Sequence, residues 1–485
     1  MPRNGSFRTA LLGVLAVAAA VRFAHLAGTT FWIDEVFESS LIHAPAGGFW
    51  AALRLDAVHP PLDYLVGRGV ARLGLPDPWG RSASVFWGVA SIAALGALVR
   101  RRGGPRAALL TAALLAAAPF HVRYSQELRP YALGTFLTCL SLLLLDRALE
   151  RPTAARGAAL FASLLATAYA LYLAGLSAAI GGAAMVATDA FSPDSGRRAA
   201  ARRLARLSIP GAAALAILYA PWWPAVRVAS ERISRRSGPA VDFRRLRLML
   251  AFFTVSPKQE GWAFGPKLLY LVAFAAAIAL LAAGTAVALR RPALRFLPVW
   301  GFLGIGAVEA LRALSPSFGA FRYALPSGIA LAAIAAVAID ALLATSPPSG
   351  AAALAFTLGF QSWALADYYR EGRYDWSREL AFLRARPENE TIFTSAHNPQ
   401  YCLAYYLCGP QWLTDGHRCG RPLVNLEGDT RPLDAMKGAG RPFSLVLDGM
   451  PASAAPRAWA RGYPIFEFPE AEGTVVAIVS PREAR

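Results

Sequence analysis

The sequence carries little charge for its length. Only 16% of its 485 residues are charged, whereas 55% are hydrophobic and the mean hydropathy is +0.39. A soluble domain contains roughly 25% charged residues, and it does not need apolar residues in blocks as long as those found here. The composition therefore excludes an ordinary soluble protein and favours a protein that crosses a membrane repeatedly.

Lysine and familiar catalytic motifs are also scarce. Lys258, Lys267 and Lys437 are the only lysines, so arginine supplies nearly all of the net charge of +18. Such an excess suits nucleic acid, an anionic membrane surface or phosphate-bearing ligands. The arginines lie mostly in short loops between apolar blocks, which argues against nucleic acid. No P-loop, His-Glu-x-x-His or Gly-x-Ser-x-Gly pattern is present, so we do not expect ATP-driven transport by this chain alone.

Cysteine is limited to four residues, and no Cys-x-x-Cys pattern indicates a metal site. Cys139 lies inside an apolar block, whereas Cys402, Cys408 and Cys419 fall in the polar C-terminal region. If that region lies outside the cell, one disulfide with one thiol left over is a reasonable expectation. Three unpaired cysteines are an equally good interpretation.

Long apolar blocks are what the sequence does contain. A spanning helix needs about 20 apolar residues, and about eleven segments approach that length. An uncleaved N-terminal anchor is preferred to a signal peptide, because no small-x-small cleavage site follows the first block. The candidate spans are 9–27, 82–99, 106–120, 130–147, 156–171, 173–190, 207–223, 266–289, 295–313, 321–343 and 349–366.

The basic loops set the predicted orientation. With the N-terminus inside, the arginine-rich loops 100–106, 147–156, 197–206 and 290–295 all fall in the cytoplasm, as the positive-inside trend requires. We therefore predict a mainly helical membrane domain over 1–366, with its C-terminal end outside. The expected outer segments are 28–81, 121–129, 224–265 and 367–485.

The segment 367–485 differs in character from the rest. Three β-type runs, 391–396, 443–448 and 474–479, alternate with helix-like segments. This alternation predicts a small extracytoplasmic α/β domain. Two shorter apolar stretches, 62–74 and 243–254, carry arginines and are predicted to form helices that lie in the membrane interface.

An acidic pair, Asp34 and Glu35, follows the first predicted span. Adjacent residues point to different sides of the backbone, so one carboxylate can act while the other orients. Phe31 and Trp32 beside them make a low-dielectric setting, which would raise a carboxyl pKa and suit a general base. The alternative is an acidic N-cap of an interfacial helix.

Three further outer segments hold residues that could bind an anion. His59 precedes two prolines; it could bind a phosphate or assist proton transfer, although a lone loop histidine commonly does neither. The loop 120–131 packs Arg123, Glu127 and Arg129 close to hydrocarbon, where charges are costly and usually functional. An internal Arg–Glu salt bridge is the alternative there, and snorkelling to lipid headgroups is the alternative for Arg322.

The predicted topology places Asp34, His59, Arg123, Glu127 and Arg322 on one face of the membrane. Random scatter would divide them between the two faces. The convergence favours an outward-facing site for an anionic, membrane-borne ligand.

Several of these residues also form an ordered pattern. Arg22 lies late in the first span. Four motifs follow it in order: Trp32-Ile33-Asp34-Glu35, His59-Pro60-Pro61, Tyr124-Ser125-Gln126-Glu127-x-Arg129-x-Tyr131 and Arg322-Tyr323. Over about residues 7–345 the pattern resembles the bacterial relatives of protein O-mannosyltransferases, whose superfamily includes the lipid A aminoarabinose transferases. These are integral membrane glycosyltransferases of the C-type fold.

The resemblance implies inverting transfer of a sugar from a polyprenyl-phosphate donor to a glycan, lipid or protein acceptor, without a nucleotide sugar. Asp34 matches the family's catalytic base, with Glu35 in support and Glu127 as a further acidic residue near the site. The remaining expected contacts are Arg123, Arg129, Arg322, His59 and Lys258 for the donor phosphate, and Trp32, Tyr64, Tyr124 and Tyr131 for sugar or acceptor.

Two points remain open beside this resemblance. No cofactor is required by the chemistry, yet the Asp34/Glu35 pair could hold a divalent metal ion. Asp63 stands where relatives often show an aromatic residue, which puts local packing or sugar contacts in doubt. A transporter or flippase of a lipid-linked precursor is the alternative function; it would use the same outer cations without needing Asp34.

Overall fold

The computed structural model describes residues 4–56, 58–234, 242–255, 267–314, 320–371, 375–414, 419–448, 455–460, 465–469 and 475–479. The chain divides into two compact units. The first comprises Met1–Ala24, Arg54–Asp63 and Arg81–Tyr368, and the second comprises His25–Leu53, Tyr64–Gly80 and Tyr369–Arg485. The predicted outer loop 28–81 therefore belongs largely to the same unit as the C-terminal residues.

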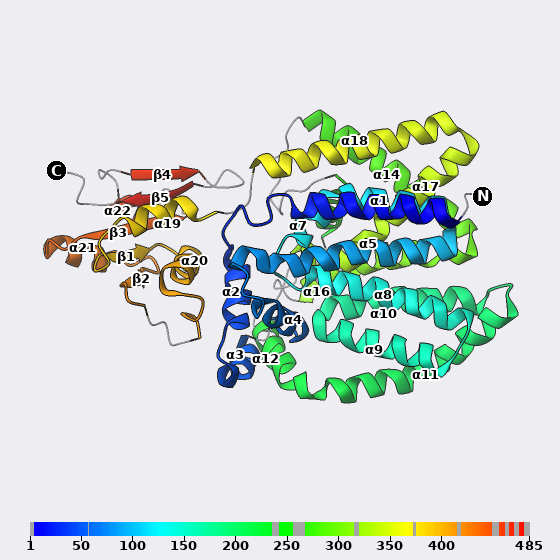
Figure 1. The fold of residues 1–485 in the computed structure, drawn as a ribbon, viewed down its shortest axis with the longest axis horizontal. Helices are drawn as coiled ribbons and strands as arrows, with labels where there is room; N and C mark the ends of the chain where they lie inside the picture. The colour runs from blue at the N-terminus through cyan, green and yellow to red at the C-terminus, as the bar shows by residue number, and fades with distance from the viewer. Residues whose placement is uncertain are drawn as a thin grey trace. The chain divides into compact units, whose positions relative to one another are not determined.

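The first unit is built from helices, most of which run roughly alongside one another (Figure 1). Its core is apolar and includes many alanines, which let neighbouring helix backbones approach closely. The helices are α1 (Asn4–Phe23), α5 (Ser82–Gly103), α6 (Pro105–Ala117), α7 (Pro119–Ser125), α8 (Tyr131–Glu150), α9 (Ala154–Ala170), α10 (Tyr172–Ala190), α11 (Ser195–Tyr219), α12 (Trp223–Ser234), α13 (Phe243–Thr254), α14 (Lys267–Arg290), α15 (Phe296–Pro298), α16 (Gly304–Leu314), α17 (Leu325–Thr345) and α18 (Pro347–Glu371).

The number of spans is smaller than predicted. Helices occupy all eleven candidate positions, but in the described part of the chain eight are long and apolar enough to cross a membrane, or nine if α6 and α7 form one broken span. Ala154–Ala170 is an apolar helix below that length, and α18 is not among the eight. Apolar composition located the helices, but it overestimated how many are long and apolar enough to be spans.

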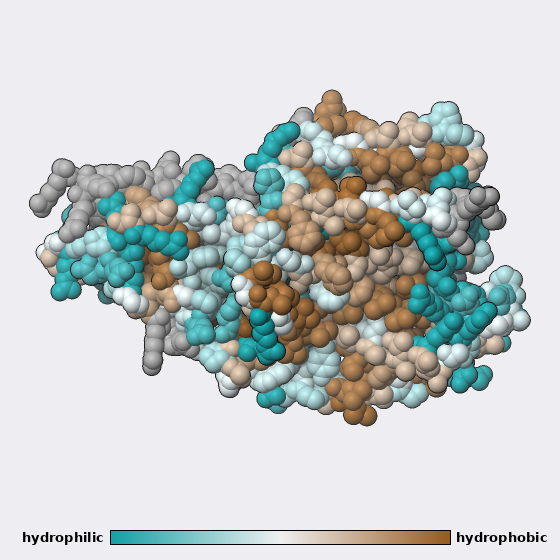
Figure 2. All heavy atoms as spheres, viewed as in Figure 1, coloured by the Kyte–Doolittle hydropathy of each residue, from teal (hydrophilic) through white to brown (hydrophobic). Residues whose placement is uncertain are grey.

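The surface of the first unit agrees with a membrane setting. Large hydrophobic side chains are exposed along α11 and α14, including Ile209, Ile217, Leu268 and Leu271. Figure 2 shows brown, hydrophobic patches spread over the helices and hydrophilic side chains gathered toward one end of them. Exposed apolar area of this kind is unfavourable in water and matches a lipid environment.

A buried ion network joins four helices at their ends. We call Arg101, Arg102, Asp146, Asp189 and Arg197 the Asp146 cluster. Asp146 accepts from Arg101 Nε at 2.5 Å, from Arg102 Nε at 2.8 Å and from Arg197 at 3.1 Å. Asp189 accepts from Arg102 and Arg197, both at 2.9 Å. The network ties α5, α8 and α10 to the start of α11.

The second unit combines seven short helices with a mixed sheet, in the part of the chain that the structure describes. The predicted helix at 62–74 is found as α4, and the one at 243–254 as α13 in the first unit. The helices of the second unit, of which α3 and α4 extend slightly beyond it, are α2 (Ile33–Ile42), α3 (Ala46–Asp56), α4 (Leu62–Ala71), α19 (Ser377–Arg384), α20 (His397–Cys408), α21 (Arg431–Gly438) and α22 (Ala455–Trp459).

The sheet confirms the predicted α/β character of the C-terminal region. Its strands are β1 (Thr391–Thr394), β2 (Leu423–Asn425), β3 (Phe443–Asp448), β4 (Ile465–Pro469) and β5 (Val475–Val479), in the order β2-β1-β3-β5-β4. β1 pairs in parallel with β2 and β3, whereas β5 pairs antiparallel with β3 and β4. Phe393, Phe443 and Leu445 lie in its apolar core.

The cysteines adopt one of the two predicted arrangements. Cys408 and Cys419 form a disulfide that closes the loop after α20, and Cys139 and Cys402 are buried and free. One disulfide with a spare thiol in the C-terminal region is therefore what the chain forms.

Candidate functional site

The predicted site residues are divided between the two units. Trp32, Asp34, Glu35 and Tyr64 belong to the second unit. The first unit holds the others, namely His59, Arg123, Tyr124, Glu127, Arg129, Tyr131 and Arg322. Lys258 lies outside the described residues. The convergence of Asp34 with the arginines stays a prediction.

Four of the predicted residues in the first unit meet around one aromatic ring. Tyr131, at the start of α8, is fully buried. The guanidinium carbons of Arg129 and Arg322 lie 6.0 and 5.8 Å from its ring centroid, and the His59 ring stands edge-on to it at 5.9 Å. We call these four residues the Tyr131 cluster. It unites the loop before α4, the α7–α8 loop and the turn that opens α17.

His59 in this cluster has unused hydrogen-bonding capacity. It is 1% exposed, and neither ring nitrogen has a hydrogen-bond partner among the described residues. Burial lowers the pKa of His59 well below its usual range, and the positive charges of Arg129 and Arg322 lower it further. The imidazole is therefore neutral, with one N–H that can donate and one nitrogen that can accept.

Asp63 is a neighbour whose role sequence reasoning did not assign. It lies in the first turn of α4 and is 7% exposed. Burial raises the pKa of Asp63 to about 7, although the charge of Arg129 acts in the opposite direction. The two side chains do not reach ion-pair distance. The only indication in the sequence was that Asp63 stands where relatives often show an aromatic side chain.

Arg123 and Glu127 adopt the salt bridge that was the alternative interpretation of this loop. Arg123 Nε lies 3.5 Å from Glu127 Oε1, and both side chains are largely buried. Between them in sequence, Tyr124 packs edge-on against Tyr131 with ring centroids 5.5 Å apart. The pair therefore borders the Tyr131 cluster and neutralises part of its charge.

Arg22 has a structural position that the sequence did not indicate. It is fully buried; Nη2 donates to the Leu115 carbonyl at 3.0 Å and Nη1 to the Ala116 carbonyl at 3.2 Å. Pro119 has no N–H for the Leu115 carbonyl, and the chain bends by 66° between α6 and α7. Arg22 satisfies the acceptors that this break exposes, and its Nε also donates to Ser125 Oγ at 3.2 Å.

The acidic pair opens α2 in the second unit. Trp32 is the N-cap residue, and its backbone N–H donates to Glu35 Oε2 at 3.4 Å. Glu35 is fully buried, whereas Asp34 is half-buried. Glu35 is therefore the third helical residue of a capping box and not the acidic N-cap of the alternative interpretation, and the two carboxylates do differ in setting, as adjacent residues on a helix should.

C-terminal residues hold the segment that carries this pair. Tyr406 Oη accepts from the Phe31 N–H at 2.6 Å, and Asp375 accepts from the Thr30 N–H at 3.0 Å. Within α2, Ser39 Oγ bonds Tyr405 Oη at 2.7 Å. In the second unit, the C-terminal region thus fixes α2 and the loop before it.

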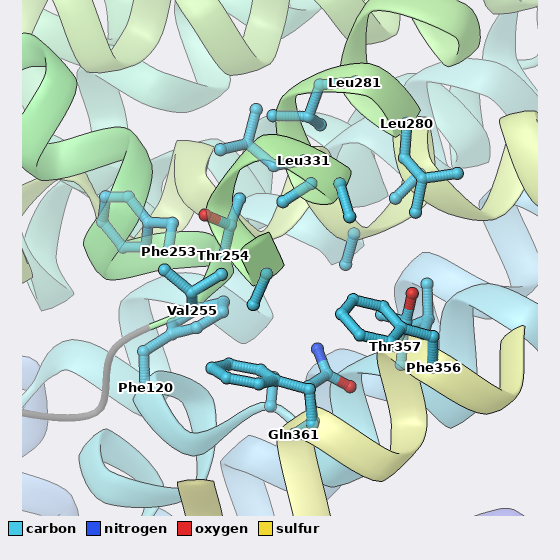
Figure 3. A pocket seen from close by; sticks show the side chains of 18 residues that line it. Phe120, Phe253, Thr254, Val255, Leu280, Leu281, Leu331, Phe356, Thr357 and Gln361 are labelled. Carbon is cyan, nitrogen blue, oxygen red and sulfur yellow. The ribbon is translucent and has the colours of Figure 1, made fainter. Parts of the chain in front are cut away.

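An apolar cavity of about 50 Å³ lies elsewhere in the first unit, among α6, α13, α14, α17 and α18. Figure 3 shows Phe120, Leu331 and Phe356 among its lining side chains, with Gln361 pointing into it. Its lining contains none of the predicted site residues. The described residues also contain no group of three or more His, Cys, Asp or Glu side chains that could hold a metal ion.

Comparison with known proteins gives consistent similarities. Residues 58–223 match the family model described as dolichyl-phosphate-mannose-protein mannosyltransferase. ArnT of Cupriavidus metallidurans, solved bound to undecaprenyl phosphate, is 16% identical with a TM-score of 0.54 over 96% of this chain and 97% of that one. The oligosaccharyltransferase of Archaeoglobus fulgidus is 14% identical with a TM-score of 0.56, over 95% and 72%. No curated protein matches in sequence.

Proposed function

We propose that this chain is a membrane glycosyltransferase that transfers a sugar from a polyprenyl-phosphate donor to an acceptor at the outer membrane face. Its C-type fold and the match of residues 58–223 to the dolichyl-phosphate-mannose-protein mannosyltransferase family support this proposal. The solved ArnT carries undecaprenyl phosphate, a ligand of the same chemical class. The acceptor is a glycan, lipid or protein hydroxyl or amine.

The Tyr131 cluster is the observation that supports this proposal. Arg129 and Arg322 bring two guanidinium groups to one aromatic ring, with the neutral His59 beside them. A guanidinium presents a fork of N–H donors that matches phosphate oxygens. The His59 N–H has no partner in the described residues and can donate to the same anion. We therefore assign the donor phosphate to this cluster.

The proposed reaction is a displacement at the anomeric carbon of the sugar, and its chemistry requires no cofactor. The acceptor O–H or N–H attacks the anomeric carbon while the carbon–oxygen bond to the phosphate breaks. The bonding electrons stay on the phosphate, where Arg129 and Arg322 stabilise the developing negative charge. Asp34 takes the acceptor proton from the opposite side of the sugar, which gives inversion.

The other predicted residues take supporting roles in this proposal. Glu35 holds the start of α2 through the Trp32 N–H and so orients the helix that presents Asp34. Glu127 partly neutralises the charge of Arg123 through their salt bridge. Lys258 is a further proposed phosphate contact, and Trp32, Tyr64, Tyr124 and Tyr131 are proposed sugar or acceptor contacts.

The outer face is proposed from charge distribution. Arginine-rich loops such as 100–106 and 197–206 stay in the cytoplasm by the positive-inside trend. That orientation puts the N-terminus inside and the C-terminal region outside, in a bacterial inner membrane.

The test is a transfer assay with purified protein, radiolabelled polyprenyl-phosphate sugars and membrane extract. We expect label to move to an acceptor with the wild type, and Asp34→Asn to lower the rate by roughly 100- to 10,000-fold, the usual worth of a general base. Polyprenyl phosphate should still bind the variant. Transfer by Asp34→Asn at the wild-type rate would remove Asp34 from the mechanism, and no transfer from any donor would refute the proposed function.

A further inference from the structure

Gln126 occupies a junction that none of the proposed roles explains. It lies in the α7–α8 loop, between Arg123 and Arg129, and is 1% exposed. Its Nε2 donates to the Arg22 carbonyl at 2.8 Å and to the Ala24 carbonyl at 2.9 Å. Its Oε1 accepts from Tyr368 Oη at 3.1 Å. One buried amide thus makes three hydrogen bonds to two distant segments.

The partners of this amide lie at two of the three points where the chain leaves the first unit. Ala24 is the last residue before the segment that leads to Asp34, and Tyr368 is the last residue before the segment that leads to the C-terminal region. Arg22 and Ala24 lie at the end of α1, where helix carbonyls have no partner within the helix. Gln126 supplies the missing donors.

The chemistry of this position selects glutamine. A glutamate has no N–H to donate to two carbonyls, and an asparagine is one methylene shorter. The neighbouring Ser125 is fixed as well, because its Oγ donates to the His121 carbonyl at 2.6 Å and accepts from Arg22 Nε at 3.2 Å. Gly88 permits this, since a Cβ there would lie 2.1 Å from Ser125 Oγ. The residue immediately before Gln126 is therefore held in place.

We propose that Gln126 is a positioning residue that fixes the starting points of the Asp34 segment and of the C-terminal region to the loop that carries Arg123, Glu127 and Arg129. The proposal rests on the proposed function for its effect on catalysis. Gln126 touches neither substrate nor reacting atoms. Its loss leaves the phosphate ligands in place but disorders the points from which the segment with the base begins, so turnover suffers more than carrier binding.

The variants Gln126→Met and Tyr368→Phe test this. Gln126→Met keeps the size of the side chain and loses all three hydrogen bonds, and we expect kcat to fall roughly 10- to 100-fold, as small misplacements of catalytic groups do. Tyr368→Phe removes one hydroxyl, and we expect a fall of about 2- to 10-fold, the effect of one net hydrogen bond. Affinity for polyprenyl phosphate should change by less than about threefold in both.

Gln361→Ala is the matched control. Gln361 is also a buried glutamine of the first unit, but it lies in the apolar cavity and its Oε1 has no hydrogen-bond partner among the described residues (Figure 3). It should leave kcat unchanged. A Gln126→Met enzyme with wild-type kcat overturns the inference, as does a loss of kcat matched by an equal loss of carrier affinity.

Amide hydrogen exchange separates this inference from the proposed function. Gln126→Met should accelerate exchange in 24–30 and 369–376, whereas Gln361→Ala should not. If the wild type transfers no sugar, the proposed function fails, and exchange then decides this inference alone: faster exchange at both junctions supports it, and unchanged exchange overturns it.

Discussion

Two buried groups of charged side chains in the first unit are built in different ways. In the Asp146 cluster each carboxylate accepts directly from two or three guanidinium groups at distances of 2.5 to 3.2 Å. In the Tyr131 cluster the guanidinium groups lie against an aromatic ring. There the nearby carboxylate, Asp63, forms no ion pair, and His59 keeps both ring nitrogens without a partner among the described residues.

We infer from this difference that the Asp146 cluster is a structural network, and we propose that the Tyr131 cluster is a binding site. Removing charge from water is costly, and a protein recovers the cost by pairing the charges with each other or by binding a ligand that pairs with them. The Asp146 cluster pairs its charges within the chain and joins four helices. In the Tyr131 cluster, His59 keeps hydrogen-bonding capacity among the described residues, which supports the proposed binding of an anion.

Breaking the Asp146 cluster should have the largest effect, and the effect should be on stability. Asp146→Ala leaves Arg102 buried without its closest carboxylate, which typically costs 3–5 kcal/mol, about the cost of any broken buried pair. Thermal unfolding in detergent measures this. Transfer per folded molecule should stay at the wild-type level; a loss of transfer without a loss of stability would contradict the structural role.

Breaking the Tyr131 cluster should instead affect catalysis. Arg129→Gln removes one of the two charges that we propose to stabilise the leaving phosphate, and we expect kcat/KM to fall roughly 100- to 1,000-fold, as for loss of one oxyanion donor. The melting temperature should fall less than it does for Asp146→Ala. Steady-state transfer and a melting curve measured on the same sample distinguish a catalytic defect from a loss of stability. A variant that loses stability but keeps its transfer rate would show that the Tyr131 cluster is structural, like the Asp146 cluster.

Asp63 should make the stability of the folded protein depend on pH. Its pKa is about 7 in the folded protein and near 3.8 when exposed, so the folded state holds a proton that the unfolded state releases between those values. Stability is then lost as pH rises from about 4 to 7, by up to ~1.4 kcal/mol per pH unit. Asp63→Asn should flatten that slope in melting curves at pH 5, 6 and 7. An equally steep slope in the variant would show that another group is responsible.

The edge of the Asp146 cluster should matter least. Arg101 is partly exposed and also pairs with Glu150 at 2.8 Å. Without Arg101, Asp146 still accepts from Arg102 and Arg197, and water can replace Arg101 at the exposed Glu150. Arg101→Gln should therefore cost about 1 kcal/mol or less. A destabilisation as large as that of Asp146→Ala would mean that the network cannot tolerate any change, which would sharpen its contrast with the Tyr131 cluster.

The helices were predictable because each long apolar block in the sequence indicates a helix at that position. All eleven predicted segments contain helices, and the predicted strands at 391–396, 443–448 and 474–479 appear as β1, β3 and β5. β2 and β4 were missed. β2 has only three residues, and β4 ends at Pro469, so neither carries a recognisable alternation. Their pairing partners, far away in sequence, define them as strands.

The residues of the candidate site were recognisable by type, but their partners were not. Arg129 was recognisable because charges beside hydrocarbon are costly, and Arg322 and His59 because residues of these types on the predicted outer face could bind a phosphate. That they meet at Tyr131 depends on helix packing across long sequence separations. The same holds for Gln126, whose partners Arg22 and Tyr368 lie at opposite ends of the first unit's sequence, and for Asp146, whose partners Arg102 and Arg197 come from two other helices.

Binding of radiolabelled polyprenyl phosphate to the double variant Arg129→Gln/Arg322→Gln tests the central claim most directly. If the Tyr131 cluster holds the carrier phosphate, the dissociation constant should rise by at least about tenfold, since each charge-assisted bond contributes roughly 1.5–3 kcal/mol, while the folded fraction of Asp146→Ala binds as the wild type does. A double variant that binds the carrier with wild-type affinity would contradict the account.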